Sequence, residues 1–308
     1  MIAFSVPAGA VAESAASPEE RLATLVNQAR SAQGLTVLAV NPELTKAAEA
    51  HGLDMIAKGY MEHESKADGA SPQTRAQRAG YAAPTNSGWL VIETISARAT
   101  AEQAVNFFLS HGQHRGVVLR PIWREMGVAF VSGGPYGQLW IVEFGCRPNV
   151  LPVLSESNAL NTTLRITNEE CNPFGGPEQM GRATQLMVSD KSSFEGGTWE
   201  PFAPSKTISS SDSPVYIKLR DSKGREATTK ATTNAALMAA AGIRSAGESQ
   251  SSFAISNPAP ILQTPVRGTQ EQEEQPPPPP SKPQSKPSGP VLINTNPPAI
   301  FAPGNILK

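Results

Sequence analysis

The side chains with the clearest chemical potential are the four histidines of the chain, His51, His63, His111 and His114. Imidazole is the usual side chain for metal ligation and for proton transfer near neutral pH. All four lie between residues 51 and 114, and Glu93 lies between them among apolar neighbours. A carboxylate in an apolar setting needs a charged or hydrogen-bonding partner. Two alternatives stay open: four histidines can cluster by chance, and Glu93 can face water at a strand edge.

The predicted elements give these side chains different surroundings. A helix is expected from Pro42 to Gly59, and His51 lies on its apolar stripe, which favours a hydrogen-bonded core histidine over a ligand. His63 follows this helix by four residues and is expected in a loop. A capping box over residues 100–103 opens the helix that leads to His111 and His114.

Patterning divides the chain into regions. Helical stripes enclosing a few strands predict an α+β fold, an α-β-α layered domain over residues 17–147. Residues 148–157 are predicted to be a linker, and short alternating runs over 158–232 predict a small all-β sandwich. Residues 233–308 are predicted to be a disordered Pro-rich tail, because such a composition cannot bury enough apolar surface to offset ordering. A brief helix within 233–243 is an alternative.

Composition excludes several classes of partner. The net charge of −1 gives no electrostatic case for nucleic acid or an anionic membrane. No apolar run reaches the roughly 18 residues needed for a transmembrane span. Residues 1–16 resemble a truncated signal-peptide remnant, with the small residues Ala10 and Ala12 spaced as at a cleavage site; a short arm is the alternative. If the protein is exported, a disulfide between Cys146 and Cys171 can form.

Several short motifs follow one another in a specific order. They are Gly59-Tyr60-Met61-Glu62-His63, Asp68-Gly69-Ala70-Ser71-Pro72, Glu93-Thr94-Ile95, His114-Arg115 and Trp140-Ile141-Val142-Glu143-Phe144-Gly145. As a set they resemble bacterial members of the CAP superfamily (cysteine-rich secretory proteins, antigen 5, pathogenesis-related one), also called the SCP domain. The region over 158–232 is similar to Ig-like or fibronectin-like modules of bacterial surface proteins.

The CAP resemblance implies a cleft with two histidines and two glutamates. It assigns the first histidine, the first glutamate and the second histidine to His63, Glu93 and His114. The second glutamate falls on Gln103, which cannot act as a base, with Glu102 beside it. The resemblance therefore implies a site of two histidines and one glutamate, which can hold Zn²⁺ or another divalent metal with an open position for water. The uncertain neighbours of this cleft are Glu102, Gln103 and His111.

The resemblance does not imply a single activity, because relatives bind divalent metal, sterol or other lipid, or glycan, and proteolysis has been proposed for a few. We expect an exported bacterial protein with a binding or interaction role at the cell envelope or outside the cell. Its expected partners are lipid, glycan or an envelope protein. The alternatives are a metal-dependent hydrolase of peptide or cell-wall substrate, and a structural surface or adhesin component.

Overall fold

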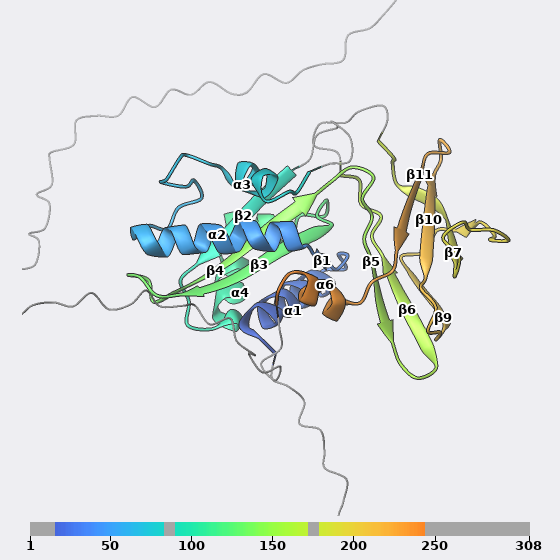
Figure 1. Ribbon diagram of the computed structural model, residues 1–308, viewed down its shortest axis with the longest axis horizontal. Coiled ribbons are helices and arrows are strands. Elements are labelled where there is room, and N and C mark those ends of the chain that lie inside the picture. The colour runs from blue at the N-terminus through green and yellow to red at the C-terminus, as the bar shows by residue number, and fades with distance from the viewer. Residues whose placement is uncertain (1–15, 83–89, 172–178, 244–308) are drawn as a thin grey trace, which may run out of the picture. The chain divides into compact units, whose positions relative to one another are not determined.

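The computed structural model describes residues 16–82, 90–171 and 179–243. Almost all of the predicted signal-peptide remnant, and the predicted tail beyond residue 243, lie outside the described residues. Within them the predicted mixture of helices and sheet is confirmed: a layered helix-and-sheet domain is followed by a region of strands (Figure 1). No helix in these ranges is long and apolar enough to cross a bilayer.

The first domain is built on a four-stranded sheet with the order β1-β3-β4-β2. Its strands are β1 (Ala39–Val40), β2 (Leu90–Ser96), β3 (Glu125–Ser132) and β4 (Gln138–Cys146). β1 runs parallel to β3, and the other neighbours are antiparallel. β4 is buried after its first residue, because helices cover both faces of the sheet; this explains why its sequence is almost continuously apolar.

Two groups of helices make the outer layers. They are α2 (Pro42–Lys58) and α3 (Pro72–Arg78) on one face, and α1 (Pro18–Ser31), α4 (Ala101–Ser110) and α5 (Gly112–Val118) on the other. Because successive strand residues point to opposite faces, β4 contributes to both cores. Trp140 and Phe144 pack with α1, α4 and α5, whereas Leu139 and Ile141 pack with α2.

Helix starts follow from capping residues. The side chains that accept a hydrogen bond from the backbone N–H three residues later belong to Ser17, Asn41, Ser71 and Thr100. α2 ends at Gly59, whose φ of 69° is a left-handed conformation that glycine adopts without steric cost. This turn sends the chain into the loop that carries His63.

The helix α2 lies very close to β3. A Cβ atom added to Gly127 would lie 2.1 Å from the carbonyl carbon of Leu44. Only a residue without a side chain permits this approach, and Gly127 is the β3 neighbour of Glu143 on β4. The contact fixes α2 above the part of the sheet where the polar groups of the first domain gather.

The second region contains two antiparallel sheets. One has the order β5-β6-β9, made of Val153–Ser157, Asn161–Ile166 and Ser205–Ser209. The other has the order β11-β10-β7-β8, made of Glu226–Lys230, Tyr216–Asp221, Ala183–Ser189 and Glu200–Pro201. Both sheets contribute to one hydrophobic core that includes Leu164 and Ile217. The predicted linker over 148–157 was therefore wrong from residue 153 onward: Val153 is buried, and β5 pairs with β6.

The predicted start of the tail at residue 233 was also wrong. Residues Asn234–Ala240 form the helix α6, which Thr233 caps. Met238 and Ile243 are buried in the same core as α1 and β4, so the chain returns to the first domain after the strands. Burial of these two apolar side chains supplies the stabilisation that a Pro-rich tail lacks.

The junction between the two regions is held covalently and by hydrogen bonds. Cys146, the last residue of β4, is joined to Cys171 by a disulfide. The buried guanidinium of Arg124 donates to the backbone carbonyls of Arg147, Val150 and Glu169, the first two at 2.9 and 2.8 Å.

Candidate functional site

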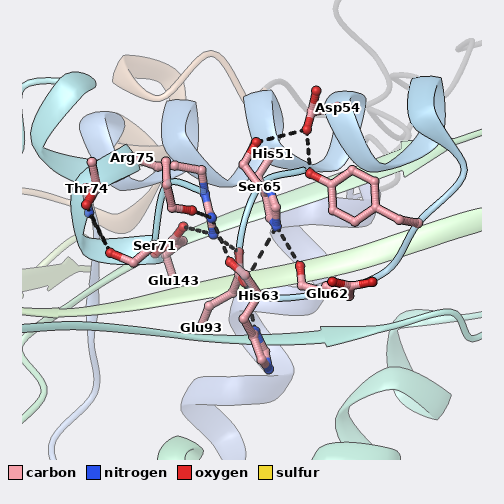
Figure 2. A network of polar contacts seen from close by, with 12 residues as sticks. His51, Asp54, Glu62, His63, Ser65, Ser71, Thr74, Arg75, Glu93 and Glu143 are labelled. Atoms are coloured by element: carbon pink, nitrogen blue, oxygen red, sulfur yellow. Dashed lines mark hydrogen bonds and ion pairs between the residues drawn. The ribbon is translucent and has the colours of Figure 1, made fainter. Parts of the chain in front are cut away.

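The exposed imidazole of His63 is bound to a buried carboxylate. Its Nδ1 lies 2.9 Å from Oε1 of Glu93, and the His63 side chain is 52% exposed while that of Glu93 is fully buried (Figure 2). The α2 terminus at Gly59 places the loop, and strand β2 places Glu93. Because the carboxylate accepts at Nδ1, that nitrogen carries the hydrogen and Nε2 is left as an acceptor toward solvent.

Arg75 of α3 holds both partners in place. Its Nη2 donates to Oε2 of Glu93 at 2.8 Å, and its Nη1 donates to the backbone carbonyl of His63 at 2.7 Å. The same Nη1 also donates to the carbonyl of Ala70 at 2.9 Å, which closes the loop before α3. A planar guanidinium with five donors suits this geometry. The arrangement is therefore a relay of Arg75, Glu93 and His63 from the interior to the surface.

A second buried carboxyl group, Glu143, lies beside Glu93. The two residues face each other across β2 and β4, and Glu143 is fully buried. Its Oε1 is 3.5 Å from Nη2 of Arg75, and neither of its oxygens has a hydrogen-bond partner among the described residues. Burial, and then the charge of Glu93, raises the pKa of Glu143 well above its ordinary value. This favours the neutral acid at neutral pH.

His51 is the core histidine that its helical position predicts. It is 1% exposed, and its Nε2 lies 2.9 Å from the carbonyl oxygen of Glu62. The same nitrogen is 3.9 Å from Oε1 of Glu93, so His51 also borders the relay. Burial is the main cause that lowers the pKa of His51, which favours the neutral imidazole.

The other two histidines gather around Phe107 of α4. The ring of His111 lies 4.1 Å from that of Phe107, and the ring of His114 lies 5.2 Å from it. Burial lowers the pKa of His114, with the charges of His63 and His111 as lesser causes. His114 is thus within electrostatic reach of both His63 and His111. The guanidinium of Arg98 covers Phe107 at 4.5 Å from the ring centre.

The two candidates at the start of α4 make other contacts. Glu102 is half-exposed and forms an ion pair with Arg21 of α1 at 2.7 Å, which lowers the pKa of Glu102. The side-chain Oε1 of Gln103 accepts a hydrogen bond from the backbone N–H of Ala99 at 3.2 Å. The backbone N–H of Gln103 donates to the side-chain oxygen of Thr100, which is the N-cap of α4. The structure thus brings neither side chain into the His63–Glu93 pair.

The contacts of Glu93 bear on the metal site predicted at His63, Glu93 and His114. Both carboxylate oxygens of Glu93 are occupied, one by His63 and one by Arg75. Within the described ranges no set of three or more His, Cys, Asp or Glu side chains has the arrangement of a metal site. His63, Glu93 and His114 therefore do not fit a three-ligand site as they stand, because Glu93 would have to give up one of its partners to bind the metal. Metal binding stays a prediction.

Residues 23–144 match the model of the Cysteine-rich secretory protein family, CAP. This part of the chain is therefore similar to a CAP domain. The match runs from α1 to β4, so it contains the relay, the three other histidines and Glu143.

Similar proteins occur in bacteria. The uncharacterized protein YkwD of Bacillus subtilis is 30% identical over 127 residues, which are 41% of this chain and 46% of that protein. The chain thus matches less than half of the length of this curated relative. An extracellular protein of Bacillus anthracis that contains an SCP domain is 25% identical, over 42% of this chain and 40% of that one, with a TM-score of 0.36. An outer surface protein of Borrelia burgdorferi is 18% identical, over 41% and 90%, with a TM-score of 0.36.

Sequence reasoning about the CAP domain missed two members of the polar network. Arg75 stood near a family motif, but nothing in the local pattern gives it a role. Glu143 stood in the run 140–145, where a single glutamate interrupts an otherwise apolar strand. That interruption was the available signal, because a strand buried on both faces leaves its carboxyl group no access to water.

Proposed function

We propose that this protein is an exported binding protein that acts at the cell envelope or outside the cell, and that its CAP domain binds a ligand at His63. The observation that carries the proposal is the relay of Arg75, Glu93 and His63. An exposed imidazole that is held by two buried charged residues is pre-organised for contact with a ligand, because its rotamer is fixed before binding.

The chemistry around His63 favours a glycan over a lipid. His63 and His114 offer ring nitrogens for hydrogen bonds, and Phe107 adds an aromatic ring next to the imidazoles of His111 and His114. A few converging polar groups fix the orientation of a polar ligand, whereas an acyl chain is bound through apolar area. Cell-envelope glycan is the expected ligand class; lipid and envelope protein are the other outcomes of the test.

Two observations support export. The disulfide between Cys146 and Cys171 is of a kind that persists in oxidising compartments and is rare in the cytosol. The family that matches the CAP domain is described as secretory. In this proposal the two β-sheets of the second region form an Ig-like sandwich that presents the CAP domain at a distance from the envelope.

A metal-dependent hydrolase is the second candidate, and one observation favours it. Glu93 orients His63 through Nδ1, as a carboxylate orients the general base in acid–base catalysis. In this alternative His63 Nε2 takes a proton from an attacking water. The metal-dependent form of this alternative, with His63, Glu93 and His114 as the predicted ligands, would use Nε2 of His63 for the metal, so a group other than His63 would then be the base. A purely structural role at the surface is the third alternative.

The experiment measures binding and cleavage together. The full chain is incubated with purified peptidoglycan, and both the retained protein and the released fragments are quantified. We expect retention that His63→Ala reduces and that His63→Gln, whose amide can still donate to Glu93, partly keeps. Gln33→Ala, at an exposed position, is the control.

The outcomes separate the candidates. Fragment release that His63→Ala and His114→Ala abolish would favour the hydrolase. Equal retention of the wild type and His63→Ala would refute a binding role of His63. Calorimetric titration with Zn²⁺, with the His63→Ala/His114→Ala double variant as control, tests the predicted metal site separately.

A further inference from the structure

The loop that carries His63 connects α2 to α3 and contains no helix or strand of its own. Such a segment keeps one conformation only where contacts hold it, because ordering its residues costs conformational entropy. Two contacts hold its backbone next to the imidazole. Arg75 donates to the carbonyl of His63, and Nε2 of His51 lies 2.9 Å from the carbonyl oxygen of Glu62. Both contacts are made to backbone atoms, so neither uses a side chain of the loop.

A third residue, Asp54 of α2, binds side chains of the loop on both sides of His63. Its Oδ2 accepts a hydrogen bond from the hydroxyl of Tyr60, which precedes His63. The same oxygen accepts one from the hydroxyl of Ser65, which follows His63, at 3.1 Å (Figure 2). The other oxygen, Oδ1, is paired with Lys58, one helical turn further along α2. The contacts with the loop and the ion pair thus use different atoms of one carboxylate.

The acceptor and its two donors are placed for strong hydrogen bonds. Tyr60 and Ser65 are buried, at 2% and 8% exposure. Burial alone would raise the pKa of Asp54, but the hydrogen bonds from Lys58 and from the two hydroxyls lower it below its ordinary value. Asp54 is therefore charged at neutral pH, and hydrogen bonds to a charged acceptor are roughly twice as strong as those between neutral groups.

Ser65 connects Asp54 to the other end of the loop. The backbone N–H of Ser65 donates to the carbonyl of Ala70 at 3.0 Å, and Arg75 donates to the same oxygen at 2.9 Å. Asp54 on α2 and Arg75 on α3 therefore hold the loop from two helices. Loss of either one would leave the segment around His63 attached on one side only.

We propose that Asp54 is a positioning residue for the ligand site at His63, because it fixes the loop before and after that histidine so that the imidazole meets Glu93 before a ligand arrives. This inference rests on the proposed binding role of His63. Without Asp54 the loop would exchange among several conformations, and only those with His63 at Glu93 could bind. The apparent affinity would then fall in proportion to the fraction of competent conformations.

The first measurement needs no ligand. In the full chain labelled with ¹⁵N-histidine, at constant pH, the hydrogen bond to Glu93 holds the hydrogen of His63 on Nδ1. Asp54→Ala should lose this tautomer signal. Asp54→Asn should recover most of it, because its amide oxygen can accept both hydroxyls in place of Oδ2. Lys58→Met, which removes only the ion pair, should keep it. The signal of His111, on the opposite face of the sheet, reports that the domain stays folded.

The second measurement is retention of the full chain on purified peptidoglycan. Asp54→Ala should bind with about threefold to tenfold lower affinity, which corresponds to a competent loop for about a tenth to a third of the time. Its maximal retention at saturation should equal that of the wild type, because the site itself is intact. Asp54→Asn should recover most of the affinity. Lys58→Met should bind like the wild type, since an exposed ion pair contributes little.

A second variant covers the case in which Asp54→Ala does not fold. Tyr60→Phe/Ser65→Ala removes both hydroxyls and leaves the carboxylate and its ion pair in place. It should show the same change of the His63 tautomer and the same loss of affinity.

The outcomes separate this inference from the proposed function. An unchanged His63 tautomer in Asp54→Ala and in Tyr60→Phe/Ser65→Ala would overturn the role of Asp54. Equal retention of these variants and the wild type, while His63→Ala is weakened, would overturn it as well. Failure of the wild type to bind peptidoglycan would count against the proposed function alone, and the tautomer signal would then decide whether Asp54 positions His63.

Discussion

Glu93 and Glu143 are directly opposed on β2 and β4, and both side chains are fully buried beneath α2. One guanidinium, that of Arg75, lies 2.8 Å from the first carboxyl group and 3.5 Å from the second. A single cation cannot compensate two carboxylates that are both fully buried. The pair therefore stays together only if Glu143 keeps its proton, which the raised pKa of Glu143 provides.

The first prediction concerns the pH dependence of stability. The pKa of Glu143 is raised in the folded state, so above its ordinary value of 4.5 the folded chain binds more protons than the unfolded chain. This contribution to stability is full below pH 4.5 and decreases as the pH rises toward the folded pKa, by at most about 1.4 kcal/mol per pH unit. Glu143→Gln has no carboxyl group to titrate at this position, so it does not lose stability in this way. The free energy of unfolding of Glu143→Gln, measured with urea, should therefore rise relative to that of the wild type between pH 5 and pH 8.

The control for this prediction is Glu156→Gln, at an exposed glutamate of β5. Its pH profile should be parallel to that of the wild type. A parallel profile for Glu143→Gln as well would mean that Glu143 titrates alike in the folded and unfolded chain.

The second prediction concerns the cation of the relay. Arg75→Leu should lower the free energy of unfolding by about 3–5 kcal/mol, because it leaves Glu93 charged, buried and without its main partner. Arg75→Lys should recover part of this loss, since an ammonium cannot reach Glu93 and the His63 backbone together. Arg78→Leu, at an exposed ion pair, should change stability by less than about 1 kcal/mol. Similar losses in Arg75→Leu and Arg78→Leu would contradict the relay.

The third prediction uses the close approach of α2 to the sheet. Gly127→Ala should destabilise the protein by about 3 kcal/mol or more, because the new methyl group overlaps the backbone of Leu44 and Thr45. Gly116→Ala is the matched control. Gly116 lies in α5, and a Cβ atom added to it would have no atom within 4 Å. It should stabilise the protein by about 0.5–1 kcal/mol. Thermal unfolding of both variants checks the opposite signs.

The fourth prediction concerns the disulfide. It closes a loop with a sequence separation of 25 residues, and its removal in the Cys146→Ser/Cys171→Ser variant should cost about 3 kcal/mol. A reducing agent should lower the melting temperature of the wild type and leave that of the double variant unchanged. Detection of two free thiols in the oxidised wild type would show that the pairing does not form in solution.

Local rules predicted the helix starts, because a cap depends on residues only three positions apart. Examples are the helix that begins at Pro42 and the helix that the capping box over residues 100–103 opens. The need of Glu93 for a partner was also readable, but the role of Arg75 was not, because Arg75 reaches strand β2 from the helix α3. Glu143 could not be placed opposite Glu93 without the register of β2 against β4. That register depends on the whole packed sheet.

The strand β5 and the helix α6 show the same limit. Val153 and Leu154 follow Pro152 in a stretch whose composition is that of a linker, and only pairing with β6 makes them a strand. Met238 lies in an alanine-rich segment with little pattern of its own. A core formed by distant residues decides its structure, since burial supplies the stabilisation that the local sequence lacks.

The return of α6 to the first domain changes how the protein would respond to mechanical load. A force applied through the residues after Ile243 reaches α6 before it reaches any strand of the second region. The apolar contacts of Met238 and Ile243 with the first domain would have to break first. At its other end the second region is tied to β4 through Cys146 and Cys171. The two sheets are thus an insertion between two anchors, and a chain cut after β4 would lose both anchors and leave an uncovered apolar patch on the first domain.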